Sequence, residues 1–179
     1  MTIGSASFAH MKLVLHKMSF GVYIFVFDLN SSYVCCLHYD VRWLCVIHVR
    51  LYRCLECVNA VDIALILDSS SQLGGESNFN VLKQFVSDVV SNYVVDASAA
   101  RIALVSFSST ATLRWSLLTH GSVSALQQAV SSLRYENGQS NIAAGLQLAR
   151  ESVFTAAGGY RSNVPNIAIL IAGSSANVR

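Results

Sequence analysis

Three short apolar runs constrain the fold of this chain most strongly. They read VDIALIL (residues 61–67), RIALVSF (101–107) and NIAILIAG (166–173), and each is rich in branched side chains. Nearly continuous apolar runs of this length are typical of strands that helices bury on both faces of a parallel sheet. The stretches between them carry apolar residues at helical spacing, which indicates an α/β layered sheet.

The connecting stretches predict three helices and one further strand. The first helix follows Gly74-Gly75 with Ser77 as its N-cap, the second opens at Gly121-Ser122, and the third has its apolar face between Ile142 and Val153. Residues 111–117 alternate between apolar and polar side chains, and their short link to the preceding strand requires an antiparallel hairpin. The expected fold is therefore a doubly wound, mostly parallel sheet with one antiparallel edge strand.

The first third of the chain differs in composition from the rest. All five cysteines and four of the five histidines lie in residues 1–57, whereas residues 58–179 contain no cysteine. We therefore predict a boundary near Cys57. Residues 1–57 form an unassigned apolar lead-in, rich in cysteine and aromatic residues, and residues 58–179 form the domain.

Two interpretations of the lead-in stay open. The run FGVYIFVF (20–27) follows the basic Lys12 and Lys17 and could be the core of a signal peptide, although no clear small-x-small cleavage motif comes after it. The alternative is a mis-assigned gene start. Neither this run nor residues 33–49 reaches the roughly 18–20 uninterrupted apolar residues of a membrane span, so we predict no span.

Charge and motifs argue against nucleic-acid binding and catalysis. Residues 58–179 hold seven basic and seven acidic side chains, and no basic cluster is present that would release counterions from a phosphate backbone. No glycine-rich phosphate-binding motif follows any of the strands. Ser69, Ser70 and Ser71 could include a nucleophile, but the nearest histidine in the domain is His120, so we predict no catalytic residues.

Polar loops follow the strands at the edge where α/β sheets bind ligands. These loops are residues 68–75, 136–141 and 172–175, and we expect them to meet at the carboxyl ends of the strands. Asp68, Ser70 and Ser140 carry hard oxygen donors suited to Mg²⁺ or Ca²⁺. The alternative is that Asp68 and Ser70 accept hydrogen bonds from neighbouring backbone N–H groups, as such residues do in turns.

From about Asp62 to Arg179 the chain resembles a von Willebrand factor type A domain. The resemblance is carried by VDIALILDSSSQLGGESNFNVLKQFV, RIALVSFSSTATLRWSL and LRYENGQSNIAAGLQLARESVF. The tail FTAAGGYRSNVPNIAILIAGSS is similar to the repeated domains of type VI collagen and related matrix proteins. Members of the family continue beyond the strand at 166–173, so the resemblance implies a domain that is incomplete at its C-terminal end, with the edge of that strand uncovered.

The resemblance also implies a metal-ion-dependent adhesion site. Asp68 and Ser70 match the first two ligands of its D-x-S-x-S motif, and Ser140 replaces the family's threonine. Gln72 stands where the second serine belongs, and Ala172 stands where the third loop has an aspartate. Because Mg²⁺ demands nearly ideal octahedral oxygen ligation, these two replacements imply a degenerate site with weak Mg²⁺ binding at most, and no other cofactor.

The implied function is that of a non-enzymatic protein-binding module. It would belong to a secreted protein of the extracellular matrix or of cell adhesion, and its partners would be matrix proteins or cell-surface receptors. The alternative is an intracellular protein of the same family that acts as an assembly subunit, which the zero net charge of residues 58–179 and their lack of cysteine would allow.

Overall fold

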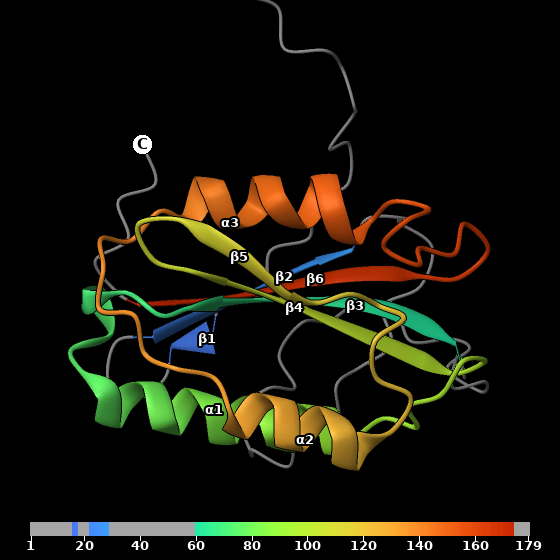
Figure 1. Ribbon diagram of the computed structural model, residues 1–179, viewed down its shortest axis with the longest axis horizontal. Coiled ribbons are helices and arrows are strands. Elements are labelled where there is room, and N and C mark those ends of the chain that lie inside the picture. The colour runs from blue at the N-terminus through green and yellow to red at the C-terminus, as the bar shows by residue number, and fades with distance from the viewer. Residues whose placement is uncertain (1–15, 18–21, 29–59, 174–179) are drawn as a thin grey trace, which may run out of the picture.

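The predicted apolar runs form the centre of a six-stranded sheet. The computed structural model describes residues 16–17, 22–28 and 60–173, and the predicted boundary near Cys57 lies outside them. The strands follow the order β1-β2-β6-β3-β4-β5 across the sheet (Figure 1). Their bounds are β1 His16–Lys17, β2 Val22–Asp28, β3 Val61–Asp68, β4 Ala100–Phe107, β5 Ala111–Trp115 and β6 Asn166–Gly173.

The parallel centre and the antiparallel hairpin are confirmed. β3 pairs in parallel with β4 on one side and with β6 on the other, so that Leu65 lies opposite both Leu104 and Ile169. β5 returns beside β4 in the antiparallel direction and forms an edge of the sheet. The carboxyl ends of β3 and β6 therefore lie at the same edge of the sheet, as the doubly wound topology requires.

The expectation that the edge of β6 is uncovered is wrong. β2 pairs with β6 in the antiparallel direction, from Val22 opposite Gly173 to Asp28 opposite Ile167. An open strand edge presents unpaired N–H and C=O groups, and an extended apolar segment elsewhere in the chain can satisfy them. The sequence shows that residues 20–27 are apolar, but a single apolar run does not indicate which strand it pairs with.

Helices cover both faces of the sheet (Figure 1). α1 (Glu76–Ser91) and α2 (Val123–Ser131) lie on one face, and α3 (Ile142–Leu148) lies on the other and continues into the π-helix η2 (Ala149–Val153). α2 opens after Gly121-Ser122, as predicted, and the Ser122 side chain caps it by accepting a hydrogen bond from Ala125 N. The helices thus bury the strands on both sides, which explains their nearly continuous apolar sequence.

The N-cap predicted for the first helix is wrong. α1 begins at Glu76 with Gly75 as its N-cap, and Ser77 already lies inside the helix. Gly74 and Gly75 have φ angles of +79° and +128°, which favour glycine. The turn between the 3₁₀-helix η1 (Ser71–Leu73) and α1 is therefore completed by the two glycines, and the helix starts directly after them.

The two faces of the sheet hold two separate apolar cores. Alternate β3 residues, from Val61 to Leu67, join the core that includes the buried side chains of α1 and α2. Ala64 and Ile66 join the core that includes η2. Gly145 lets α3 approach the second face closely, since a Cβ added to it would lie 2.9 Å from the Phe107 ring.

An ion pair fixes the amino end of β3. The Asp62 side chain is fully buried, and its Oδ1 accepts hydrogen bonds from Arg161 Nε at 2.9 Å and from Arg161 Nη2 at 2.7 Å. Its other oxygen accepts from the backbone N–H of Arg161 at 2.8 Å. Arg161 Nη2 also donates to the carbonyl of Ala99, just before β4, at 2.8 Å. One guanidinium therefore joins the starts of the two parallel strands to the loop before β6.

We expect Arg161→Ala to lower the free energy of unfolding by about 3–5 kcal/mol, because it leaves the buried Asp62 carboxylate without its counter-ion. Urea denaturation followed by far-UV circular dichroism measures the change. Arg150→Ala is the matched control, because it removes an arginine from an exposed ion pair. The side chain of Arg150 is 60% exposed and that of its partner Glu151 is 49% exposed. That change should cost less than about 1 kcal/mol, and equal losses in the two variants would contradict the structural role of Arg161.

Candidate functional site

The described parts of the polar loops meet at one edge of the sheet, as the sequence predicts, whereas residues 174–175 of the third loop lie outside the described part of the chain. Ser69 N donates to Phe107 O at 2.8 Å, and Ser71 N donates to Gly138 O at 2.8 Å, so the loop after β3 contacts both the end of β4 and the loop before α3. Asn141 N donates to Ser108 O at 3.0 Å and joins that loop to the β4–β5 turn. We call these segments the loop rim, which comprises residues 68–75, 108–110, 134–141 and 172–173.

Asp68 connects the ends of two parallel strands. Its side chain is fully buried at the last position of β3. Oδ1 accepts a hydrogen bond from Ser70 N at 2.8 Å, and Oδ2 accepts one from Gly173 N, at the end of β6, at 2.9 Å. Each carboxylate oxygen therefore has a backbone donor, which offsets the cost of burying the group.

Ser69 holds the loop before α3 against the end of β3. Its hydroxyl is fully buried, accepts a hydrogen bond from Glu136 N at 2.9 Å and donates to Arg134 O at 3.3 Å. Its carbonyl accepts a second hydrogen bond from the same loop, from Asn137 N at 3.0 Å. Ser69 is thus not placed as a nucleophile, because its hydroxyl cross-links two loops.

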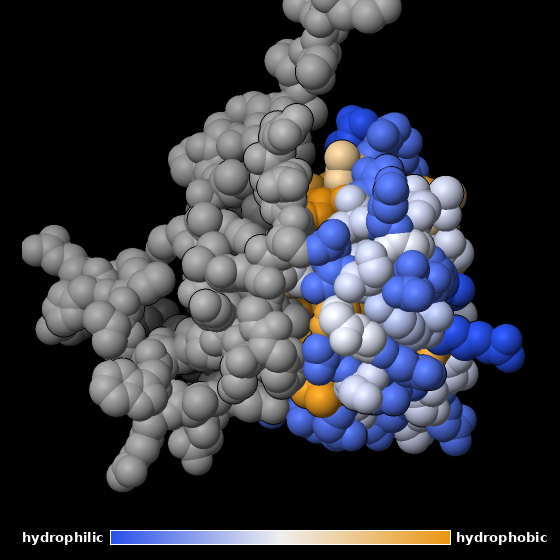
Figure 2. Space-filling view, turned by 90° about the vertical axis from the view of Figure 1, so that its left-hand side faces the viewer, coloured by the Kyte–Doolittle hydropathy of each residue, from blue (hydrophilic) through white to orange (hydrophobic). Residues whose placement is uncertain are grey.

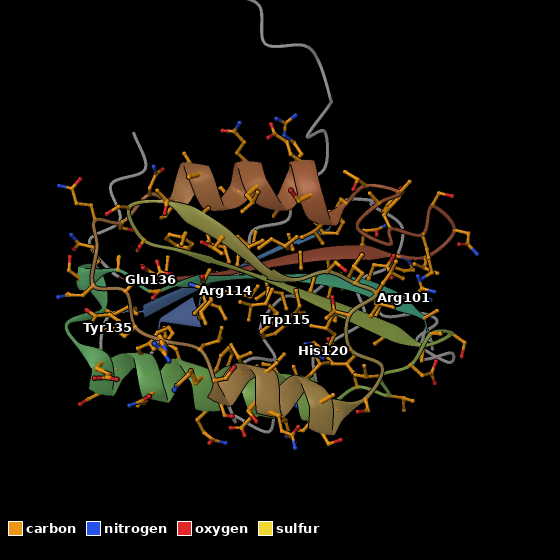
Figure 3. All side chains as sticks on the ribbon, viewed as in Figure 1. Arg101, Arg114, Trp115, His120, Tyr135 and Glu136 are labelled. Atoms are coloured by element: carbon orange, nitrogen blue, oxygen red, sulfur yellow. The ribbon has the colours of Figure 1, made fainter. Side chains whose placement is uncertain are left out.

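Arg114 and Glu136 form a polar network that sequence analysis missed. Arg114, on β5, donates through Nη2 to Glu136 Oε1 and through Nε to Ser106 Oγ, the second of these at 2.7 Å. Ser108 Oγ donates to Glu136 Oε2 at 2.5 Å. Figure 3 shows the arginine and the glutamate, from two different segments, at the loop rim. Two isolated charges in the sequence could have indicated this pair, because Arg114 is the one charged residue of β5 and Glu136 is the one acid of residues 134–141.

The residues proposed as metal ligands have unequal surroundings. Ser70 is fully buried, and its hydroxyl accepts a hydrogen bond from Gln72 N at 3.3 Å, so both Asp68 and Ser70 make the turn contacts of the alternative interpretation. The side chain of Ser140 ends in a buried oxygen with no hydrogen-bond partner among the described residues. Gln72 is exposed, and Ala172 is buried and has no oxygen in its side chain.

These donors do not fit a tightly held divalent ion. Asp68 is the one carboxylate among them, and each of its oxygens accepts a backbone hydrogen bond, so one charged group with half of its lone pairs free would have to supply most of the ligation. The orphaned hydroxyl of Ser140 is the one feature that favours an ion, but a single neutral oxygen supplies little of the ligation that Mg²⁺ needs. In the described part of the chain, no three His, Cys, Asp or Glu side chains gather into a metal-binding group.

The candidate nucleophiles and the histidine are not brought together. Ser69 and Ser70 are fully buried, with their hydroxyls in hydrogen bonds to backbone groups. His120 packs against Trp115 instead, with the rings edge to face and their centroids 5.4 Å apart. Figure 3 shows these two aromatic side chains next to α2, well away from Tyr135 and Glu136 at the loop rim.

The family model of the von Willebrand factor type A domain matches residues 62–178. The chain belongs to this family. The match spans the polar loops, the ion pair at the start of β3 and all of both cores except Val61. Val22–Asp28, which form β2, lie outside it. No helix among the residues that the structure describes is both long and apolar enough to cross a membrane.

Known relatives of this VWA domain are several times longer than the matched region. The Collagen alpha-1(XII) chain of Notophthalmus viridescens is 31% identical over 119 residues, which cover 65% of this chain and 13% of that one. Matrilin-3 of Mus musculus is 31% identical over 114 residues, or 62% of this chain and 24% of the relative. The chain thus spans a quarter or less of these two relatives.

A solved structure gives the same fold. Proximal thread matrix protein 1 from the mussel byssus superposes with a TM-score of 0.55 and 25% sequence identity, and the match covers 60% of this chain and 29% of that one. The similarity agrees with a mostly parallel sheet between two layers of helices, so the predicted fold class is confirmed.

We expect Asp68→Asn to lower the free energy of unfolding by about 1–3 kcal/mol, because the amide nitrogen cannot accept the hydrogen bond that a carboxylate oxygen accepts. Chemical denaturation measures the loss. Glu76→Gln removes the same charge at an exposed position in the first turn of α1, and should cost less than about 1 kcal/mol. Equal stability of the two variants would show that the Asp68 carboxylate does not hold the loop rim together.

Proposed function

We propose that this VWA domain is a non-enzymatic protein-binding module that recognises its partner through the loop rim without a divalent ion. The module would belong to a secreted protein of the extracellular matrix or of cell adhesion. The observation that carries the proposal is the hydrogen bonding of Asp68 and Ser69, which joins three loops of the rim directly. A surface fixed in this way is ordered before its partner arrives, which lowers the entropic cost of binding.

The exposed chemistry of the loop rim suits hydrogen bonding to another protein. Figure 2 faces this end of the molecule and shows mostly hydrophilic and neutral colours over the described residues. The exposed side chains there include amides, hydroxyls and one arginine, namely Gln72, Ser109, Thr110, Arg134, Asn137 and Gln139. Such groups can donate to and accept from the backbone and polar side chains of a partner, as the polar parts of protein interfaces do.

Metal independence is supported by the positions that differ from the family motif. Where the resemblance implies a serine and an aspartate, this chain has Gln72 and Ala172. A Cβ added to Gly173 would lie 2.8 Å from the carbonyl oxygen of Gln72, so the first loop packs directly on the end of β6. The backbone of one loop thus contacts the end of the other strand without an ion between them.

Two observations support a binding role rather than catalysis: the hydrogen bonding of the serine hydroxyls in the first loop, and the names of the similar proteins. The two buried serines of the first loop use their hydroxyls in backbone hydrogen bonds. The similar proteins carry the names of a collagen chain, of matrilins and of a thread matrix protein. Secretion and a matrix partner are the part of the proposal that rests on those relatives.

The test is binding of the full chain to decellularised extracellular matrix, in the presence of Mg²⁺ and of EDTA. We expect equal binding in both, and a loss of about fivefold or more when Gln72→Ala and Gln139→Ala are combined, since each exposed amide can contribute about 0.5–1.5 kcal/mol through a hydrogen bond.

The matched control is the pair Ser162→Ala and Asn163→Ala, two exposed polar residues in the loop before β6 at the opposite end of the strands. Their binding should equal that of the unmodified chain. Binding that EDTA abolishes would contradict metal independence. An equal loss in the rim pair and the control pair would contradict the location of the binding surface.

A further inference from the structure

The outer edge of β6 holds a strand that the family match does not include. The VWA match begins at residue 62, whereas β2 comprises Val22–Asp28. β2 pairs with β6 over seven consecutive positions in the antiparallel direction. We propose that this edge is a strand-accepting site for an extended apolar segment, and that the chain fills it with its own residues 22–28.

The backbone of β6 alternates between its two neighbours. Pro165 O accepts a hydrogen bond from Asp62 N at 3.0 Å, and Gly173 N donates to the carboxylate at the end of β3, so the odd-numbered positions point toward β3. Strand alternation directs the even-numbered N–H and C=O groups to the opposite edge, where β2 lies. Those positions are Ala168, Leu170 and Ala172, which pair in register with Phe27, Phe25 and Tyr23.

β6 requires a partner at this edge. With β2 in place, Leu170 and Ala172 are 4% and 1% exposed, and in that buried setting a backbone group without a hydrogen bond would carry a large desolvation cost. A strand laid along the edge satisfies these groups through its own main chain. In such contacts the main-chain hydrogen bonds supply affinity, and side chains at alternate positions supply specificity.

The sequence of β2 shows which kind of segment the edge accepts. It reads VYIFVFD, which is six aromatic or β-branched residues followed by one acid, a composition with a strong preference for strands. The paired positions lie well over a hundred residues apart in the chain. Because no tight turn connects the two strands, a separate molecule can present the same backbone groups to β6.

The experiment measures binding of a fluorescently labelled peptide of residues 20–28, extended by two lysines for solubility, to the full chain carrying Phe25→Pro. Proline removes an N–H that points toward β6 and breaks the ladder at its middle, so the chain's own strand leaves the edge open. We expect the peptide to bind this variant at least about tenfold more tightly than the unmodified chain, whose own strand competes at a high effective concentration.

The same peptide with Phe25→Pro is the matched control and should not bind. Equal binding of the two peptides, or no binding to a folded Phe25→Pro chain, would overturn the proposal.

Hydrogen exchange in the unmodified chain tests the site if that variant does not fold. The amides of Ala168, Leu170 and Ala172 should exchange as slowly as those of Ile169 and Ile171, which point toward β3. Exchange at least about tenfold faster at the three even-numbered positions would mean that the edge is open, and would reject the proposal.

Discussion

The buried carboxylate of Asp68 is the interaction on which the loop rim depends. Asp68 ends β3, and its two oxygens accept hydrogen bonds from Ser70 N in its own loop and from Gly173 N at the end of β6. A buried carboxylate is costly unless each oxygen has a donor, so the charge holds both backbone segments in place. Ser69, the next residue, then positions the loop before α3 through the N–H of Glu136 and the carbonyl of Arg134.

β3 carries a buried acid at each end, and the two acids have different partners. Asp62, near the amino end, binds a guanidinium together with a backbone N–H, whereas Asp68, at the carboxyl end, accepts from two backbone N–H groups. The ion pair stabilises the end of the sheet opposite the loop rim. Because backbone N–H groups satisfy Asp68, the charged side chains of the rim are not needed to pair with it. Arg134 and Glu136 are among these side chains, and they are at least partly accessible to a partner.

Much of the fold follows from the sequence, because burial on both faces leaves a clear signal. The apolar runs at 61–67, 101–107 and 166–173 identify the parallel strands, and the alternation in 111–117 identifies the edge hairpin. The pairing of β2 with β6 does not follow, since main-chain hydrogen bonds between distant segments leave no mark on side-chain patterns. The wrong N-cap has a different, local cause: the glycines at positive φ complete the turn, so the helix starts before Ser77.

The candidate site was predictable as a place but not as a set of contacts. The carboxyl ends of parallel strands meet at one edge, so the topology located the loops. Which oxygen accepts which N–H depends on backbone geometry within a few tenths of an ångström, and residue types alone do not fix it. Arg114 and Glu136 were missed because the two lie in separate segments that only the folded sheet brings together.

Amide hydrogen exchange of Ser70 and Gly173, followed by NMR with Mg²⁺ and again after chelation, tests most directly whether the carboxylate of Asp68 holds the rim without an ion. Both amides donate to that carboxylate, so we predict slow exchange at both positions and the same rates in the two conditions. Fast exchange at either amide once the metal is removed would show that an ion, and not Asp68 alone, orders the loops.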